Sequence, residues 1–218
     1  TYSCRDLLLP LDNLIIDCAS PMRSRYFETE AYRDFLYEAM ENGSEWISAP
    51  KPKLQDEVFQ MEDLTLPSTK WLQTILKPRG YRLHVAEKFY TYAHFDSTVI
   101  PLRPGLVLFN GARLSKDWYP RIFKDWDKIF FPADKIVDID CALPNGVTTT
   151  SPYIGLNLLS VNEKLVICDE NQIHLRAELD KWGIESIGLK MRHAKTLAGG
   201  FHCVSLDTKR KGSRQDYF

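Results

Sequence analysis

The sequence predicts a globular α/β protein in which short strands alternate with helices in units of roughly 40 to 60 residues. Two observations lead to this class. Short apolar runs that end at Gly, Pro, Asn or Asp residues are typical of buried strands. Between them lie stretches with apolar residues four positions apart, which is the spacing of one helix face. A chain of 218 residues, 44% hydrophobic and 26% charged, is long enough for one sizeable core or two small ones.

The first half of the chain begins with a strand, turn and strand pattern. Two apolar triplets flank a turn-forming Pro-Leu-Asp-Asn stretch. The helix that follows is indicated by Ala31, Phe35 and Ala39, and Asn42-Gly43 is a typical helix end. Residues 44–69 show no clear period. The expected elements are strands at 7–9 and 14–16, helices at 30–40 and 69–76, the second ended by Gly80, and a strand at 81–85.

The second half repeats the alternation with equally short apolar runs. Ser115 is a suitable N-cap for one helix, which would present Trp118, Phe123 and Trp126. Asn171 is a suitable cap for the other, and Gly183 ends it. The expected elements are strands at 92–102, 105–110, 129–131, 164–169, 184–191 and 203–206, with helices at 115–126 and 171–182.

The stretch 197–207 carries the most informative pattern of the sequence. Val204 and Leu206 alternate with Cys203 and a serine as in a strand. The preceding Gly199-Gly200 pair has no side-chain bulk, so a ligand or another backbone can come very close. A cysteine behind a glycine pair and beside His202 is placed as a nucleophile would be. The alternative, which is the commoner case for a lone cysteine, is a buried structural residue, and the local sequence leaves both open.

Other polar side chains fit either a site or an ordinary surface. His94, Asp96 and Thr98 alternate on one face of the strand expected at 92–102, and a histidine two residues from an aspartate is a suitable acid–base pair. Taken alone, His94 is more often structural. Asp6 alone is a solvated strand end. Arg23 and Arg25, in the loop before the first helix, could bind a carboxylate.

Charge and cysteine usage exclude several classes of protein. A net charge of −1 gives no electrostatic case for binding nucleic acid or an anionic membrane. The five cysteines are odd in number, widely spaced and without a CxxC pair, which excludes the usual zinc patterns and argues against a disulfide framework. We therefore predict a reducing, cytoplasmic compartment. No apolar run approaches the roughly 18 residues of a membrane helix.

Several motifs match a known family in one consistent order. The stretch 199–203, Gly-Gly-Phe-His-Cys, is followed by Asp207 and Arg210, and the stretch 94–98, His-Phe-Asp-Ser-Thr, by Pro-Gly-Leu-Val-Leu at 104–108. Arg5-Asp6, the Met-Arg-Ser-Arg-Tyr-Phe-Glu run and the Ala-Pro-Lys-Pro run at 49–52 complete the series. Together they resemble the amidinotransferases, most of all the glycine and inosamine-phosphate amidinotransferase group of the guanidino-group-modifying superfamily. The resemblance covers nearly the whole chain except 60 to about 68.

The resemblance implies an α/β propeller (pentein) of ββαβ modules around a fivefold pseudo-axis, formed by residues 1–218 as a single domain. Two departures stand out. Ala198 replaces the first of three glycines that the family has before its aromatic-His-Cys motif. The family's Phe-Asp-Ala-Ala segment, with a catalytic aspartate, is missing near 60–69, as is the N-terminal module ahead of Arg5. We expect the full protein to carry these residues; a chain contiguous as printed is not expected to be active.

The resemblance also implies a reaction and its residues. An arginine:amine amidinotransferase would transfer the amidino group of arginine to an acceptor amine through an amidino-cysteine, releasing ornithine. By position, Cys203 is the nucleophile and His94 the general acid/base. The substrate-binding positions of the family fall on Asp6, Asp96, Arg113, Thr150 and Ser151. No metal or organic cofactor is needed, and we expect no partner besides small-molecule substrates and a second copy of the chain in a homodimer.

Two alternatives remain at this point. One is a hydrolase like the arginine deiminases, in which water replaces the acceptor amine. The other is a catalytically inactive propeller that serves as a binding subunit, which the missing aspartate segment would explain.

Overall fold

The computed structural model describes residues 2–20, 23–51, 65–86, 95–139, 150–209 and 215–218, with only the backbone at 65–68. The chain divides into two compact units, which are considered one at a time. The first unit is Asp6–Phe89, and the second combines Tyr2–Arg5 with Tyr90–Phe218. The gap expected near 60–69 falls largely outside the described residues, so it stays a prediction, as does the single domain. Among the described helices, none is both long and apolar enough to cross a membrane.

Three sheets of the described residues share one topology, which confirms the modular pattern. In each sheet the first strand pairs antiparallel with the second, and the second pairs parallel with the third. The parallel pair requires a crossover connection, as in a ββαβ module. The strands are β1 (Leu8–Leu11), β2 (Leu14–Asp17) and β3 (Glu45–Ser48); β4 (Val99–Arg103), β5 (Leu106–Asn110) and β6 (Asp127–Phe131); β7 (Leu159–Asn162), β8 (Leu165–Asp169) and β9 (Glu185–Leu189).

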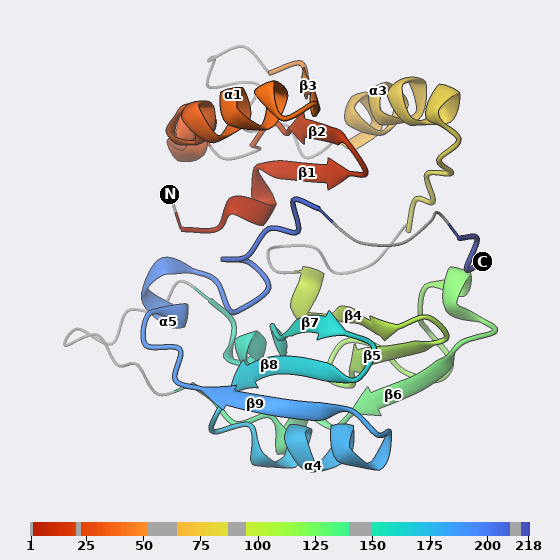
Figure 1. Ribbon diagram of the computed structural model, residues 1–218. Helices are drawn as coiled ribbons and strands as arrows, with labels where there is room; N and C mark the ends of the chain where they lie inside the picture. Colours follow the sequence, from red (N-terminus) through yellow and green to blue (C-terminus); the bar gives the residue numbers. More distant parts are fainter. Residues whose placement is uncertain (1, 21–22, 52–64, 87–94, 140–149, 210–214) are drawn as a thin grey trace. The chain divides into compact units, whose positions relative to one another are not determined.

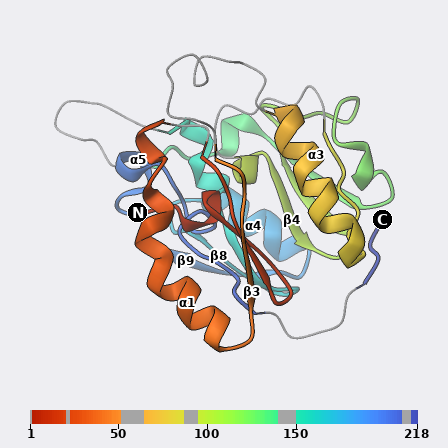
Figure 2. The same cartoon turned by 90° about the horizontal axis from the view of Figure 1, so that it is seen from above.

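Two helices flank the β1–β3 sheet of the first unit (Figures 1 and 2). The crossover from β2 to β3 contains α1 (Arg33–Glu41), and α3 (Thr65–Leu76) follows the sheet in sequence. Leu76 of α3 packs against Leu14 and Ile16 of β2 in the core of this unit. The expected helix ends are confirmed, since Gly43 and Gly80 both have positive φ angles.

One core joins the two sheets of the second unit. It contains Leu106 and Leu108 of β5, Ile129 of β6 and Val166 of β8. The crossover helix α4 (Ile173–Lys181) lies beneath the β7–β9 sheet (Figure 1). Its Leu175 and Leu179 are fully buried in the same core. The β5–β6 connection instead contains only a 3₁₀ turn at Arg121–Phe123.

Four expected elements are wrong or shortened. Residues 81–86 have no regular structure, and the strand expected at 92–102 begins at Val99. The helix expected at 115–126 is reduced to Arg121–Phe123, because Ser115 and Trp118 pair as an isolated bridge and the extended Pro120 precedes the 3₁₀ turn. Residues 203–206 form no strand. Their backbone closes turns instead, with Val204 N donating to Gly200 O and Ser205 N to His202 O.

Candidate active site

The predicted nucleophile lies in a turn that follows the short helix α5 (Ala194–Leu197). Ala198 ends this helix in the left-handed conformation, with φ of 56°. Residues 201–204 then form a turn, and Cys203 within it is only 1% exposed. The sequence departs from the family's three glycines at the position where the backbone favours glycine.

The two glycines that remain are required by close approach to neighbouring residues. A Cβ on Gly200 would lie 2.6 Å from the Cβ of Asn157 and 2.8 Å from its backbone oxygen. A Cβ on Gly199 would lie 2.8 Å from Ser3 Oγ and 3.0 Å from Cys203 Cβ. At Gly200 the clash is with the Cβ and backbone of Asn157 and is not tolerated, whereas at Gly199 the Ser3 hydroxyl would have to move aside. The prediction that the glycine pair admits another segment very closely is therefore confirmed, and the segment is the one that carries Asn157.

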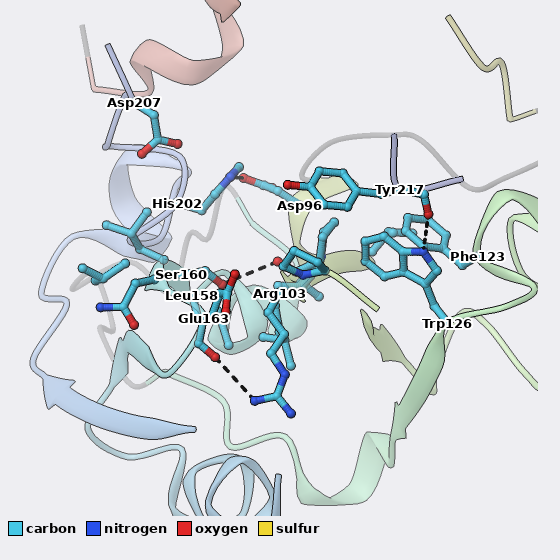
Figure 3. A pocket seen from close by; sticks show the side chains of 18 of the residues that line it. Asp96, Arg103, Phe123, Trp126, Leu158, Ser160, Glu163, His202, Asp207 and Tyr217 are labelled. Atoms are coloured by element: carbon cyan, nitrogen blue, oxygen red, sulfur yellow. Dashed lines mark hydrogen bonds and ion pairs between the residues drawn. The ribbon is translucent and has the colours of Figure 1, made fainter. Parts of the chain in front are cut away.

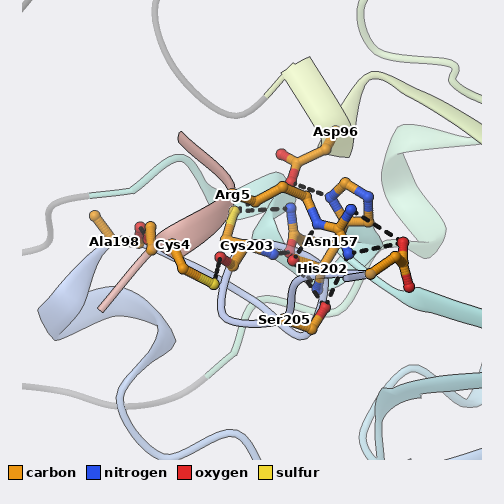
Figure 4. Close-up of polar contacts among 10 residues, drawn as sticks. Cys4, Arg5, Asp96, Asn157, Ala198, His202, Cys203 and Ser205 are labelled. Atoms are coloured by element: carbon orange, nitrogen blue, oxygen red, sulfur yellow. Dashed lines mark hydrogen bonds and ion pairs between the residues drawn. The ribbon is translucent and has the colours of Figure 1, made fainter. Parts of the chain in front are cut away.

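Asn157 contacts the nucleophile directly (Figure 4). Its Oδ1 accepts hydrogen bonds from the backbone N–H groups of His202 and Cys203, both at 3.1 Å. Its Nδ2 donates to Cys203 Sγ at 3.3 Å. One buried carboxamide thus holds both the backbone and the sulfur of the cysteine.

Asp96 lies on the other side of the thiol. It belongs to a 3₁₀ turn at Phe95–Ser97, which precedes β4. Its Oδ2 accepts from Cys203 Sγ at 3.1 Å and pairs with His202 Nδ1 at 2.7 Å. Its Oδ1 is buried and, within the described part of the chain, has no hydrogen-bond partner.

The ionised form of Asp96 is favoured. Burial alone would raise the pKa of this carboxyl group, but the hydrogen bond and charge of His202, with further hydrogen bonds from Asn157 and Cys203, outweigh it and lower the pKa. Asp96 is therefore a carboxylate at neutral pH. Its Oδ2 is hydrogen-bonded within the protein, and its Oδ1 has no hydrogen-bond partner among the described residues.

Arg5 secures the same turn from the N-terminal segment of the second unit (Figure 4). Its Nε donates to His202 O at 2.9 Å, and its backbone N donates to Cys203 O at 3.4 Å. Its guanidinium group binds Asp207 at 3.2 Å and Ser205 Oγ at 3.3 Å. Two motifs from opposite ends of the sequence therefore meet around the cysteine.

Two other described cysteines, Cys18 and Cys168, are poor candidates for the nucleophile. Burial raises the pKa of the Cys18 and Cys168 thiols to about 11 in each case. Both therefore stay protonated at neutral pH, and a protonated thiol is a poor nucleophile.

Arg113 and Ser151, two predicted substrate-binding residues, are brought together. Arg113 Nη2 donates to Ser151 Oγ at 3.2 Å, and its Nη1 donates to Thr98 Oγ1 at 2.6 Å. The guanidinium carbon lies 5.3 Å from the ring centre of Tyr153. Arg113 is thus an oriented cation, and its partner Thr98 lies two residues along the chain from Asp96. Thr150, next to Ser151, is half-buried.

Two predicted residues are not part of this arrangement as described. Asp6 belongs to the first unit, where Arg25 binds it at 2.7 Å and also binds Glu28 at 2.8 Å. Arg25 thus pairs with carboxylates of its own chain. His94 lies outside the described residues. The roles of Asp6 and His94 stay predictions.

A pocket of about 900 Å³ opens beside the Asp96–His202 pair (Figure 3). Its walls come from β4 and β7, and Trp126 and Tyr217 lie at another part of the lining. Trp126 Nε1 donates to Tyr217 O at 3.1 Å, which holds this wall together. The volume suits a small-molecule substrate.

Sequence reasoning missed three contributors to the site: Asn157, the side chain of His202, and Arg5 as a binding partner of the turn. Asn157 stands in an apolar run between Leu156 and Leu158, which are 0% and 1% exposed. A lone amide in a buried run must be hydrogen-bonded, and this is the signal that could have identified it.

Comparisons with known proteins agree with the resemblance. No protein-family model matches the chain. The inosamine-phosphate amidinotransferase 1 of Streptomyces glaucescens is 35% identical over 252 residues, covering 99% of this chain and 70% of the relative. An L-arginine:L-lysine amidinotransferase of Pseudomonas savastanoi pv. phaseolicola is 29% identical, covering 98% of this chain and 68% of the relative. The structure of the inosamine-phosphate amidinotransferase of Streptomyces griseus superposes with a TM-score of 0.88 at 35% identity, covering 99% of this chain and 70% of that one.

These similarities confirm the fold. The three described sheets are modules of an α/β propeller, the pentein fold. The span matched in the Streptomyces glaucescens relative, 252 residues, exceeds the 218 residues of the chain. The alignment therefore passes over positions at which this chain has no residue.

The left-handed Ala198 generates a stability prediction. Replacement by glycine, Ala198→Gly, relieves a conformation that costs an L-residue roughly 1–2 kcal/mol and adds unfolded-state entropy of roughly 0.4–1 kcal/mol. We expect the free energy of unfolding in urea to rise by about 0.5–1 kcal/mol. The matched control is Gly183→Ala, at φ of 68° with no atom near the added Cβ, which should be destabilising. A loss of stability in Ala198→Gly would contradict the assigned backbone conformation.

The lowered pKa of Asp96 generates a prediction about pH. A carboxyl group whose folded-state pKa lies below its ordinary value of 3.8 stabilises the protein fully above that value, and the contribution is lost as pH falls through the folded-state pKa. We expect Asp96→Asn to lower the free energy of unfolding by about 1–3 kcal/mol at pH 7. Urea titrations at decreasing pH should show the difference shrinking only below pH about 4. A difference that shrinks between pH 7 and 5 would count against this electrostatic account.

Proposed function

The chain belongs to the amidinotransferase family, and we propose that it transfers the amidino group of arginine to an acceptor amine through an amidino-cysteine on Cys203, with release of ornithine. The observation that carries this proposal is the arrangement of Asn157, Cys203 and Asp96. The Cys203 thiol, which follows the glycine pair at 199–200, has an amide donor at 3.3 Å and a carboxylate oxygen at 3.1 Å. The second oxygen of that carboxylate is buried without a partner among the described residues.

Asp96 would bind the guanidinium group of arginine. An ionised carboxylate with an unused oxygen is a strong acceptor for a guanidinium N–H, and the resulting charge-assisted hydrogen bond also fixes direction. Its bond to His202 prevents the carboxylate from rotating away. The guanidinium carbon would then lie beside Cys203 Sγ, as a productive encounter requires.

The first half-reaction forms the covalent intermediate. Cys203 gives its proton to His94, and the thiolate attacks the guanidinium carbon to form a C–S bond. The bond from this carbon to the δ-amino nitrogen of ornithine breaks, and His94 returns the proton to that nitrogen. Ornithine leaves, and the amidino group stays on the sulfur.

The second half-reaction regenerates the enzyme. The acceptor amine attacks the amidino carbon and gives a proton to His94 as the new C–N bond forms. The C–S bond breaks, and the sulfur leaves as the thiolate, which regains the proton from His94. Water in place of the amine would release the amidino group as urea, so the pocket must favour the acceptor over water.

Arg113, with Ser151 and Thr150, would hold the amino-acid carboxylate of the donor. The Arg113 guanidinium is oriented by Thr98 and Ser151 and lies over the Tyr153 ring. A planar, oriented guanidinium group is well suited to bind a carboxylate through two parallel hydrogen bonds, that is, in a bidentate manner.

The names of two relatives suggest acceptors to test: an inosamine phosphate and lysine. We propose an amine of one of these two kinds, bound in the pocket beside Asp96 and His202. Arginine labelled in the amidino carbon should be incubated with the full protein and a set of amines that includes both. Transfer of label to one amine identifies the acceptor. Labelled citrulline formed without an amine would instead identify a deiminase-like hydrolase, in which ammonia leaves arginine first, and labelled urea would show that water attacks the amidino-cysteine.

The nucleophile assignment predicts that Cys203→Ser abolishes transfer and keeps the fold, because serine is nearly isosteric but a far weaker nucleophile at neutral pH. Mass spectrometry of the wild-type protein incubated with arginine alone should locate an added amidino group on Cys203. Cys168→Ser is the control, since this thiol stays protonated, and should leave labelling unchanged. Label on another cysteine, or no label on a protein that turns over, would show that Cys203 is structural.

The general acid/base assignment predicts that His94→Asn retains arginine binding but loses turnover by about 10²- to 10⁴-fold, the usual contribution of proton transfer. Calorimetric titration with arginine in a Cys203→Ser background measures binding without chemistry. A near-normal rate in His94→Asn would mean that His94 is a structural histidine.

A further inference from the structure

The geometry points to Asn157 as a positioning residue for the nucleophile, one that fixes the turn of Cys203 and donates a hydrogen bond to its sulfur. This inference rests on the proposed function in taking Cys203 as the nucleophile. It adds a residue that the family motifs in the sequence did not indicate. Asn157 is 2% exposed, and both ends of its carboxamide are engaged by the cysteine turn.

The orientation of the carboxamide is fixed by its partners. Two backbone N–H groups, of His202 and Cys203, converge on one atom at 3.1 Å each. Only an oxygen can accept both bonds, so this atom is Oδ1 and the opposite atom is the NH₂ nitrogen. The nitrogen lies 3.3 Å from Cys203 Sγ and can only donate to it.

The backbone of Asn157 is itself rigidly held. It follows the 3₁₀ helix Pro152–Leu156, and its N–H donates to Ile154 O at 2.9 Å. Its neighbours Leu156 and Leu158 are both members of the main core of the second unit. The side chain therefore cannot move without disturbing the core, and Gly200 packs against its Cβ, Oδ1 and backbone oxygen.

The two polar neighbours of the sulfur have opposite effects. The Asp96 carboxylate, 3.1 Å away, accepts from the thiol and opposes a second negative charge. The Asn157 NH₂ group donates, so its bond to the sulfur is stronger when the sulfur is a thiolate. Asn157 should therefore speed reactions of the thiolate.

The primary test replaces Asn157 by aspartate, Asn157→Asp, in the full chain. The acceptor of the two N–H groups is kept, and the donor to the sulfur becomes an oxygen. The rates are measured at pH 8–9, where the introduced carboxyl group is ionised. We expect alkylation of Cys203 by iodoacetamide and its amidination by arginine to slow about 10- to 100-fold, which is the usual effect of losing a hydrogen bond to a charged group. Arginine affinity is measured separately in the Cys203→Ser background, because Asn157 also donates a hydrogen bond to Asp96, the carboxylate that would bind the guanidinium group.

The matched control is Gln172→Glu. Gln172 is also fully buried and also bonds backbone groups through both ends of its carboxamide, at Val137, but no contact joins it to the sulfur in the described structure. It should lose stability and keep the wild-type alkylation rate. A purely structural role for Asn157 predicts the same result for Asn157→Asp, which would overturn the inference.

A second variant and a separate readout keep the outcomes distinct. Asn157→Ala removes the donor without adding charge and should slow alkylation in the same direction. If neither Asn157 variant folds, as judged by circular dichroism, the positioning role is rejected in favour of a structural one. If the wild-type protein gains no amidino group from arginine, the proposed function fails, and the iodoacetamide rates still decide the role of Asn157.

Discussion

The close approach of Gly200 to Asn157 is the constraint on which the rest of the site depends. No side chain fits between them, because even a methyl group would lie 2.6 Å from the Asn157 Cβ. This contact brings the carboxamide within reach of the next turn, where it binds two backbone N–H groups and the sulfur. The thiol in turn faces Asp96, whose Oδ1 has no partner among the described residues and would bind a cation in the proposed reaction. A single larger residue at position 200 would therefore displace the nucleophile, its donor and its carboxylate together.

The modular fold explains how distant parts of the sequence supply equivalent polar groups. A 3₁₀ helix precedes the first strand of each described sheet: Cys4–Asp6 before β1, Phe95–Ser97 before β4 and Pro152–Leu156 before β7. The candidate polar residues Asp6, Asp96 and Asn157 lie within or directly after these helices. A 3₁₀ helix is short, and the residues at its end lie outside the hydrogen-bond ladder of the sheet. Each module can therefore offer one polar side chain without disturbing its strands.

The sequence predicted strands well where they are continuous apolar runs in the core. It predicted segments poorly where hydrogen bonds from distant residues hold the backbone in a turn. The strands at Leu106–Asn110 and Leu165–Asp169 are nearly continuous apolar runs within the core, and both are confirmed. The alternation at 203–206 resembles a strand equally well, but long-range bonds from Arg5 and Asn157 hold this segment as a turn, and neither partner is near it in the sequence. Spacing and the family resemblance together made Cys203 and Asp96 candidates for the site. They could not identify Asn157, whose role depends on two residues some 45 positions away.

The arrangement of charges also bears on substrate choice in the proposed reaction. The sulfur has a carboxylate oxygen at 3.1 Å, which would repel a thiolate, and an amide donor at 3.3 Å, which would attract one. A guanidinium cation bound to the free oxygen of Asp96 would remove the repulsion, so the nucleophile would become most reactive once the cation is in place. A neutral amide or ester of similar size would leave the repulsion intact. Selectivity for guanidines would then arise from activation of the thiol as well as from binding, which links specificity and rate through the same carboxylate.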